Sequence, residues 1–201
     1  MANAIDNPTA IQRQVERDYR WNFVVNALDG ASFWFGMSFI SSTIILPLFV
    51  SRFTDNPLLI GLIPFLATAG TFLPQLFTAN WVEHAPLKKF FPVTIGFFLE
   101  RLPLFLLPPM VYFLATSQPT LTLILFFMLY AWHCFGVGVI IVGWQDMVAK
   151  IFPVDKRGQF FGITNFIGNG SGILGALALP IVLTQFGFPL GFVVSFAIAA
   201  G

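Results

Sequence analysis

Apolar residues along this chain form long stretches that are separated by short polar links. The stretches cover about residues 22–50, 58–81, 91–114, 120–145 and 159–184, and a sixth at 188–201 has only about 14 residues. A helix needs roughly 20 apolar residues, at a rise of 1.5 Å each, to cross the hydrocarbon core of a bilayer. The pattern predicts an all-α integral membrane protein, a helical bundle with five full transmembrane helices and a truncated sixth.

Composition and charge agree with a lipid environment and indicate an orientation. Hydrophobic residues make up 57% of the chain and charged residues 9%, whereas charged residues are about 25% of soluble domains. Eight of the ten basic residues lie before the first stretch or in the 82–90 and 146–158 links: Arg13, Arg17, Arg20, Lys88, Lys89, Lys150, Lys156 and Arg157. Because basic residues that flank spans are retained in the cytoplasm, we expect a multi-pass protein of the plasma (inner) membrane with a cytoplasmic N-terminus.

The first 20 residues differ from the rest because they are polar. Thr9 precedes Gln12 by three residues, which is the spacing of a capping box, and Ile11, Val15 and Tyr19 share one helical stripe. This pattern predicts a short amphipathic helix at the cytoplasmic interface, with a solvated leader as the alternative. We therefore divide the chain into a leader, 1–20, and a transmembrane bundle, 21–201.

Proline and glycine interrupt the apolar stretches. Prolines at 47, 64, 74, 103, 108, 109 and 180 predict helices that bend, because freed backbone groups in a membrane need a neighbouring helix or a water-filled cavity. Gly168, Gly172 and Gly175 form a flat stripe that lets another helix approach closely. Residues 170–175 also match the G-x-G-x-x-G fingerprint, but that fingerprint requires a preceding strand, so no nucleotide cofactor is expected.

Four ionisable residues lie deep within the stretches, where they usually line a cavity or form pairs: Asp29, Glu100, Arg101 and His133. Adjacent residues on a helix project about 100° apart, so Glu100 and Arg101 should pair poorly with each other. We expect Arg101 to pair with Asp29, and Glu100 to face His133 or a cavity. Two acids against one base leave a carboxylate that is either protonated or free to bind a proton or cation. The alternative is a static clamp between helices, with His133 as a satisfied core residue.

This layout resembles the N-terminal six-helix half of a major facilitator superfamily transporter over residues 20–201. The resemblance is carried by the cytoplasmic N-terminus, the tight outer links, the 153–162 segment before a glycine-rich span, and an echo at 79–89 of the signature G-x-x-x-D-R-x-G-R-K. It implies alternating access, in which two six-helix halves rock around a central site, and therefore a missing C-terminal half as a partner. It also implies a cytoplasmic gate, for which the matching positions are Glu83, Lys88, Lys89 and Arg157. Asp146, four residues before Lys150, either belongs to this gate or forms a surface ion pair beside Trp144 as an interfacial anchor.

The function expected from these features is secondary active transport of a small solute, with or without a proton, by a protein of which this chain is a fragment. Its expected partners are the lipid bilayer, the solute and the second half, and no nucleic acid. A non-transporting scaffold or receptor is the main alternative. A membrane enzyme is less favoured, because the spans offer neither an H-E-x-x-H motif nor a carboxylate-rich metal cluster.

Overall fold

The computed structural model describes the backbone of residues 8–84 and 91–201, and these residues form helices and no strands. The α-helices are α1 (Pro8–Ser38), α2 (Ile45–Val50), α3 (Pro57–His84), α4 (Leu102–Leu114), α5 (Pro119–Ile151), α6 (Arg157–Phe186) and α7 (Leu190–Ala200). Two π-helical segments, η2 (Phe91–Ile95) and η3 (Phe97–Arg101), precede α4, and a short 3₁₀ segment, η4 (Val154–Lys156), precedes α6.

Within the described residues, four helices are long and apolar enough to cross a membrane: Pro57–Thr78, Val93–Leu114, Pro119–Ile151 and Val154–Phe186. They correspond to four of the five predicted full spans. The remaining prediction, a span over 22–50, differs from the structure, where this stretch is divided between α1 and α2. The described residues are therefore all-helical and include helices that can cross a membrane, but four of these helices, and not five, are long and apolar enough.

The break between α1 and α2 has a local cause in the sequence. Pro47 has no N–H, and its ring clashes with the carbonyl four residues earlier, which belongs to Thr43. The backbone N–H groups of Ile45 and Leu46 both donate to the carbonyl of Ser41, at 3.0 and 3.1 Å. Hydroxyl side chains in this segment offer the backbone further alternatives to helical bonds. The chain therefore unwinds at 39–44 and restarts as α2.

The described part of the leader, residues 8–20, forms the first part of α1 and not a separate helix. No glycine or proline lies between Thr9 and Asp29, so nothing in the sequence interrupts the helix before it enters the bundle. Where the leader meets the bundle, the side chains of Tyr19 and Phe23 pack against Phe152 at the end of α5 and Phe160 near the start of α6. This small aromatic cluster joins α1 to the end of α5 and the start of α6.

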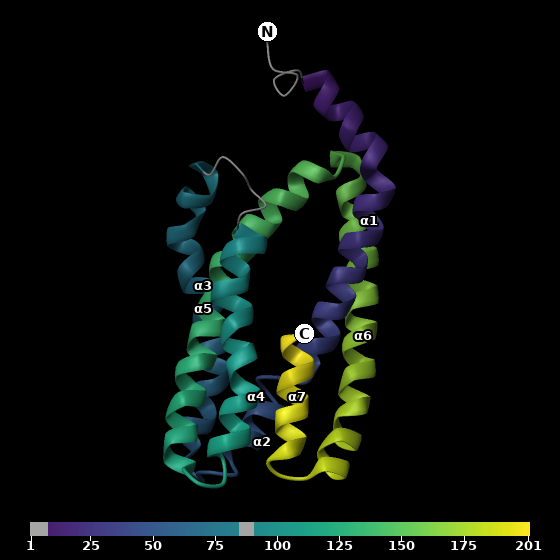
Figure 1. The fold of residues 1–201 in the computed structure, drawn as a ribbon. Helices are drawn as coiled ribbons and strands as arrows, with labels where there is room; N and C mark the ends of the chain where they lie inside the picture. The colour runs from purple at the N-terminus through teal and green to yellow at the C-terminus, as the bar shows by residue number, and fades with distance from the viewer. Residues whose placement is uncertain (1–7, 85–90) are drawn as a thin grey trace.

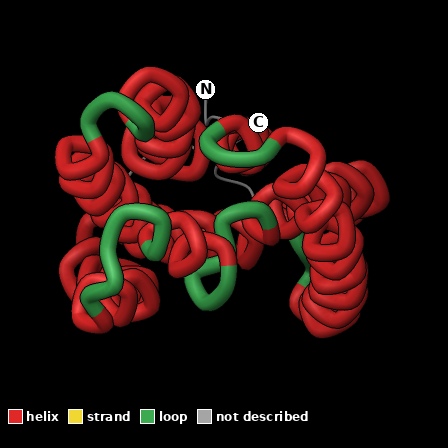
Figure 2. Tube along the Cα trace, turned by 90° about the horizontal axis from the view of Figure 1, so that it is seen from below, coloured by secondary structure: helices red, strands yellow, loops and turns green. Residues whose placement is uncertain are grey.

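The long helices pack in pairs (Figure 1). α1 runs along α6, α3 runs along α5, and α4 packs between α5 and α7. α7 also contacts α6 and α1, so it connects the α1–α6 pair to the α3–α4–α5 group. The short connections after α2, α4 and α6 all lie at the same end of the bundle, as the view from that end shows (Figure 2). Successive long helices are therefore antiparallel.

The α1–α6 pair is close because α6 presents small residues to α1. A Cβ added to Gly175 would lie 2.9 Å from the carbonyl oxygen of Phe35, and Gly168 lies against the ring of Trp34. Between these glycines, the hydroxyl of Ser171 donates to the carbonyl of Ala31 on α1 at 2.7 Å. The glycine stripe found in the sequence is thus the surface of α6 that meets α1.

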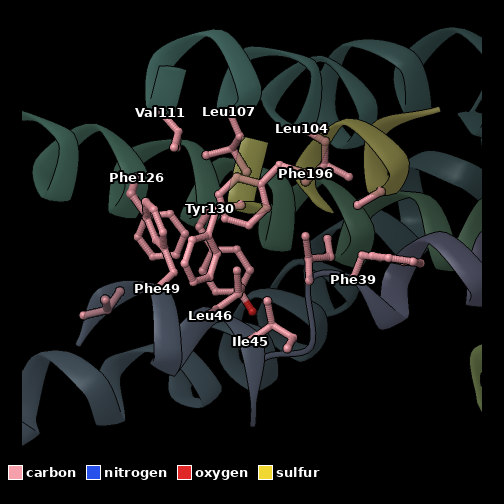
Figure 3. Close-up of a cluster of buried hydrophobic side chains, with 14 of the residues drawn as sticks. Phe39, Ile45, Leu46, Phe49, Leu104, Leu107, Val111, Phe126, Tyr130 and Phe196 are labelled. Carbon is pink, nitrogen blue, oxygen red and sulfur yellow. The ribbon is translucent and has the colours of Figure 1, made fainter. Parts of the chain in front are cut away.

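The main core lies at the end of the bundle that holds the short connections, and it is built around α2 (Figure 3). Phe49 is fully buried, and its ring lies 5.2 Å from Phe126 of α5 and 5.1 and 5.2 Å from Phe192 and Phe196 of α7. Leu46, also fully buried, lies beside this group. The second half of the broken span is therefore an anchor that fixes α5 and α7 around it.

Candidate functional site

Two cavities adjoin each other along the face formed by α1, α3, α5 and α6. One, of about 570 Å³, is lined by Asp29, Glu100 and Arg101, and we call it the charged cavity. The other, of about 820 Å³, is lined in part by the unwound 39–44 segment, and none of its described lining residues is Asp, Glu, Lys or Arg; we call it the neutral cavity. The residues that line both are Trp34, Met37, Thr71 and Val137. The two cavities are therefore consecutive compartments of one groove.

The charged cavity brings together three of the four deep ionisable residues, but their pairing differs from the one expected. The Nε atom of Arg101 lies 3.8 Å from Oε1 of the adjacent Glu100. The guanidinium carbon of Arg101 lies 5.5 Å from the ring centroid of Phe33 on α1. Among the described residues no ion pair joins Arg101 to Asp29, whose side chain is exposed to the cavity.

The expectation that Glu100 and Arg101 pair poorly assumed an ordinary α-helix. They lie instead on η3, a π-helical segment in which the N–H of Leu102 bonds to the carbonyl of Phe97, five residues earlier. A π-helix has more residues per turn, so the angle between consecutive side chains is smaller than in an α-helix. Pro103 follows at once and cannot donate to the carbonyl of Leu99, which favours the irregular geometry. The wider turn lets the two neighbouring side chains meet.

His133 of α5 is almost completely buried, and its side chain contacts the backbone of η3. Its Nδ1 atom lies 2.9 Å from the carbonyl oxygen of Glu100, so an Nδ1–H tautomer donates to that carbonyl. The carboxylate of Glu100 is not the acceptor. This bond fits the alternative in which His133 is a satisfied core residue, and it fixes the part of η3 that carries Glu100 and Arg101.

Gly136 lies one helical turn after His133 on the same face of α5 and also meets η3. A Cβ at this position would lie 2.9 Å from the backbone nitrogen of Glu100 and would overlap the carbonyl of Leu99. Only glycine allows this approach of the two backbones. His133 and Gly136 together therefore hold the charged segment against α5.

Polar and aromatic residues that the sequence did not assign to a solute site complete the charged cavity. Asn26 of α1 and Asn165 of α6 add amide groups, and Trp144 of α5 adds an indole ring that lies 6.2 Å from the ring of Phe161. The sequence left Trp144 between a gate and an interfacial anchor, because hydropathy does not report which side of a helix end faces a cavity. The side-chain amides indicate a site that forms hydrogen bonds as well as ion pairs.

The neutral cavity is lined by hydroxyl groups from the break in the first span. Ser38 donates to the carbonyl of Phe35 at 2.6 Å, and the hydroxyls of Ser41 and Thr43 lie 3.2 Å apart. Ser38 and Ser41 line the cavity together with Tyr130 and Asn169. This compartment offers hydrogen bonds without a fixed charge.

Asp146 and Arg157, the two residues of the predicted cytoplasmic gate whose side chains the structure describes, line neither cavity. Asp146 accepts from Lys150 at 3.1 Å on the same helix. Arg157 donates from Nε to the carbonyl of Phe152 at 3.2 Å and from Nη2 to the carbonyl of Ala149, so it caps the C-terminus of α5. Lys88 and Lys89, and the side chain of Glu83, lie outside the described residues.

The described residues contain no group of three or more His, Cys, Asp or Glu side chains that could hold a metal ion. The only cysteine, Cys134, is buried. Comparison with protein-family models, with curated proteins and with solved structures finds no match for this chain. The groove and the way the helices pair around it are therefore the features that point to a function.

Proposed function

We propose that this chain is one six-helix half of a secondary active transporter that works by alternating access and couples a small solute to a proton. In this proposal the chain resembles the N-terminal half of a major facilitator superfamily transporter and lies in the plasma (inner) membrane with its N-terminus in the cytoplasm. The groove formed by α1, α3, α5 and α6 is its half of the central site, and a second six-helix half closes that groove.

The helix pairing is the observation that carries this proposal. If α1, α3 and α4 are matched in order with α5, α6 and α7, the packing of α1 on α6 corresponds to that of α5 on α3. The packing of α1 on α7 likewise corresponds to that of α5 on α4, while α4 and α7 pack on each other. Each helix is matched with the one three positions later in a series of alternating directions, so the second set has the opposite orientation. Inverted repeats of three helices are typical of secondary transporters of this class.

The contents of the groove support transport over a scaffold. Ionisable side chains within spans are expensive and usually serve a substrate or proton pathway. The charged cavity holds Asp29 and Glu100 against the single guanidinium of Arg101. Because Glu100 pairs with Arg101, Asp29 is left to bind a cation, and Glu100 exchanges a proton by leaving that pair. The cavity lies beside a broken span, and discontinuous spans commonly form transporter sites. A scaffold gains nothing from either feature.

In the proposed cycle, the charged cavity opens to the cytoplasm and the neutral cavity opens to the outside. The side chains shared by the two cavities, Trp34, Met37, Thr71 and Val137, form the constriction between them. Rocking of the second half over this face exposes one cavity at a time. Glu100 exchanges a proton with the cytoplasm while the charged cavity is open, and with the outside, through the constriction, while the neutral cavity is open.

Two asparagines on α6 allow a direct test, because they lie one turn apart on opposite sides of the constriction. Asn165 lines the charged cavity and Asn169 lines the neutral cavity, and both are exposed. Single cysteines are introduced at each position with Cys134→Ala, in the protein encoded by the complete reading frame. With a membrane-impermeant maleimide, N169C is labelled from outside in whole cells and N165C from the cytoplasmic side in inside-out vesicles, each under proton gradients of opposite sign.

Alternating access predicts reciprocal labelling, in which the gradient that increases the reactivity of N169C decreases that of N165C. A cysteine in the outer connection at Asp55 is the matched control, and its reactivity should not change. Reactivities at Asn165 and Asn169 that stay constant under both gradients would favour the scaffold and contradict the proposal. A membrane enzyme has no supporting observation among the described residues.

A further inference from the structure

We infer that the charged cavity binds an organic cation, a protonated amine or quaternary ammonium group attached to a small apolar body. Asp29 supplies the counter-charge, and the indole rings of Trp34 and Trp144 supply the wall against which the cation lies. This inference rests on the proposed function only in taking the charged cavity as the solute site.

The charges of the cavity select a positively charged solute. Its described lining holds the carboxylates of Asp29 and Glu100 and the guanidinium of Arg101. Arg101 is already engaged by Glu100 at 3.8 Å, and the side chain of Glu100 is only 12% exposed. Asp29 is exposed and belongs to no ion pair within the described part of the chain. The carboxylate that is open to a ligand is therefore that of Asp29.

The aromatic residues favour an organic cation over a metal ion. A cation within about 6 Å of an aromatic ring centroid is attracted by the ring quadrupole, most strongly by Trp. Arg101 already lies in this way over Phe33, at 5.5 Å, so the wall of this cavity accepts a cation in the folded protein. Trp34 and Trp144 line the same cavity and offer further rings to a solute. A metal ion would need several oxygen ligands around one point, and the described residues provide no such group.

The size and remaining polar groups of the cavity fit the same class of solute. Its volume of about 570 Å³ is within the range of roughly 300–1,000 Å³ that small-molecule sites occupy. Asn26 and Asn165 can hydrogen-bond a hydroxyl or carbonyl on the body of the solute. An anionic solute would compete with Glu100 for Arg101 and would be repelled by Asp29. The cavity therefore discriminates by charge and not by size alone.

The experiment compares choline with 3,3-dimethylbutan-1-ol, which has nearly the same shape but carries carbon in place of the charged nitrogen. Binding to the full-length protein in detergent is measured by isothermal titration calorimetry. We expect choline to bind at least tenfold more tightly than the alcohol. Asp29→Asn should weaken choline binding at least tenfold and leave binding of the alcohol within twofold. Asp55→Asn, in an outer connection away from the cavity, should change neither.

A second pair of variants tests the aromatic wall independently of Asp29. Trp144→Leu should weaken choline binding several-fold, whereas Trp21→Leu, at an exposed position outside the cavity, should not. The inference is overturned if choline binds no more tightly than the alcohol. It is also overturned if Asp29→Asn binds choline as tightly as the wild type does. Because binding needs no transport, cation binding without reciprocal cysteine labelling would reject the transporter and retain the site.

Discussion

Gly136 offers the sharpest test of how α5 holds the charged segment of the third span. Gly136→Ala places a methyl group 2.9 Å from the backbone nitrogen of Glu100 and in overlap with the carbonyl of Leu99. Both are backbone atoms that cannot rotate away, so the two helices must separate by about 1 Å to reach ordinary contact distance. The separation also lengthens the hydrogen bond from His133 to Glu100, now 2.9 Å.

Three effects determine how much Gly136→Ala changes the free energy of unfolding. Overpacking of this kind costs about 1–3 kcal/mol, and a weakened bond to a buried carbonyl costs about 1 kcal/mol more. The higher helix propensity of alanine returns about 1 kcal/mol. We therefore expect Gly136→Ala to lower the free energy of unfolding by about 2 kcal/mol, the sum of these terms near the middle of their range.

Gly170 provides the matched control, because it lies inside α6 with no atom within 4 Å of an added Cβ. Gly170→Ala should raise the stability by about 0.5–1 kcal/mol through helix propensity alone. Unfolding of both variants is followed by circular dichroism in mixed micelles with increasing SDS. If Gly136→Ala is as stable as Gly170→Ala, α5 and η3 do not approach as closely as described here.

Two further predictions concern the ion pair and the orientation. Arg101→Ala should destabilise the chain more than the double variant Arg101→Ala, Glu100→Gln, because the single change leaves a buried carboxylate without its partner; additive effects in SDS unfolding would show that the pair contributes nothing. In a Cys134→Ala background, a cysteine at Gln118 should react with an impermeant maleimide from outside the cell, and one at Lys156 only after permeabilisation. Outside labelling at Lys156 would reverse the orientation.

Most of the long helices could be predicted from the sequence, but the positions of the interruptions within them could not. Length and hydropathy alone locate α3, α5 and α6, because a span in lipid must bond its whole backbone internally. The break at 39–44 was not located, although Pro47 was recognised as an interruption, because hydropathy is the same for a helical and an unwound apolar segment. The π-helical geometry before Pro103 likewise depends on the contact with Gly136, a residue 33 positions further along the chain than Pro103.

The sequence grouped four deep ionisable residues, of which three line the charged cavity, while His133 is buried and lies at the neutral cavity. Depth in the spans identified Asp29, Glu100 and Arg101, which line one cavity. Their partners depend on helix rotation, and the wider turn of η3 brings Arg101 to Glu100 in place of Asp29. Trp144 could not be assigned to the cavity from sequence, since an indole at a helix end serves equally well as a membrane anchor.

The central claim is that a carboxylate on the third span links proton binding to the opening of the groove. The most direct measurement is the reactivity of N165C under proton gradients of opposite sign, with and without Glu100→Gln. We predict that reactivity changes with the gradient in the parent protein and in an Asp55→Asn control, and becomes independent of the gradient in Glu100→Gln. A Glu100→Gln variant that responds to the gradient as its parent does would contradict the claim and make the Glu100–Arg101 pair a static clamp.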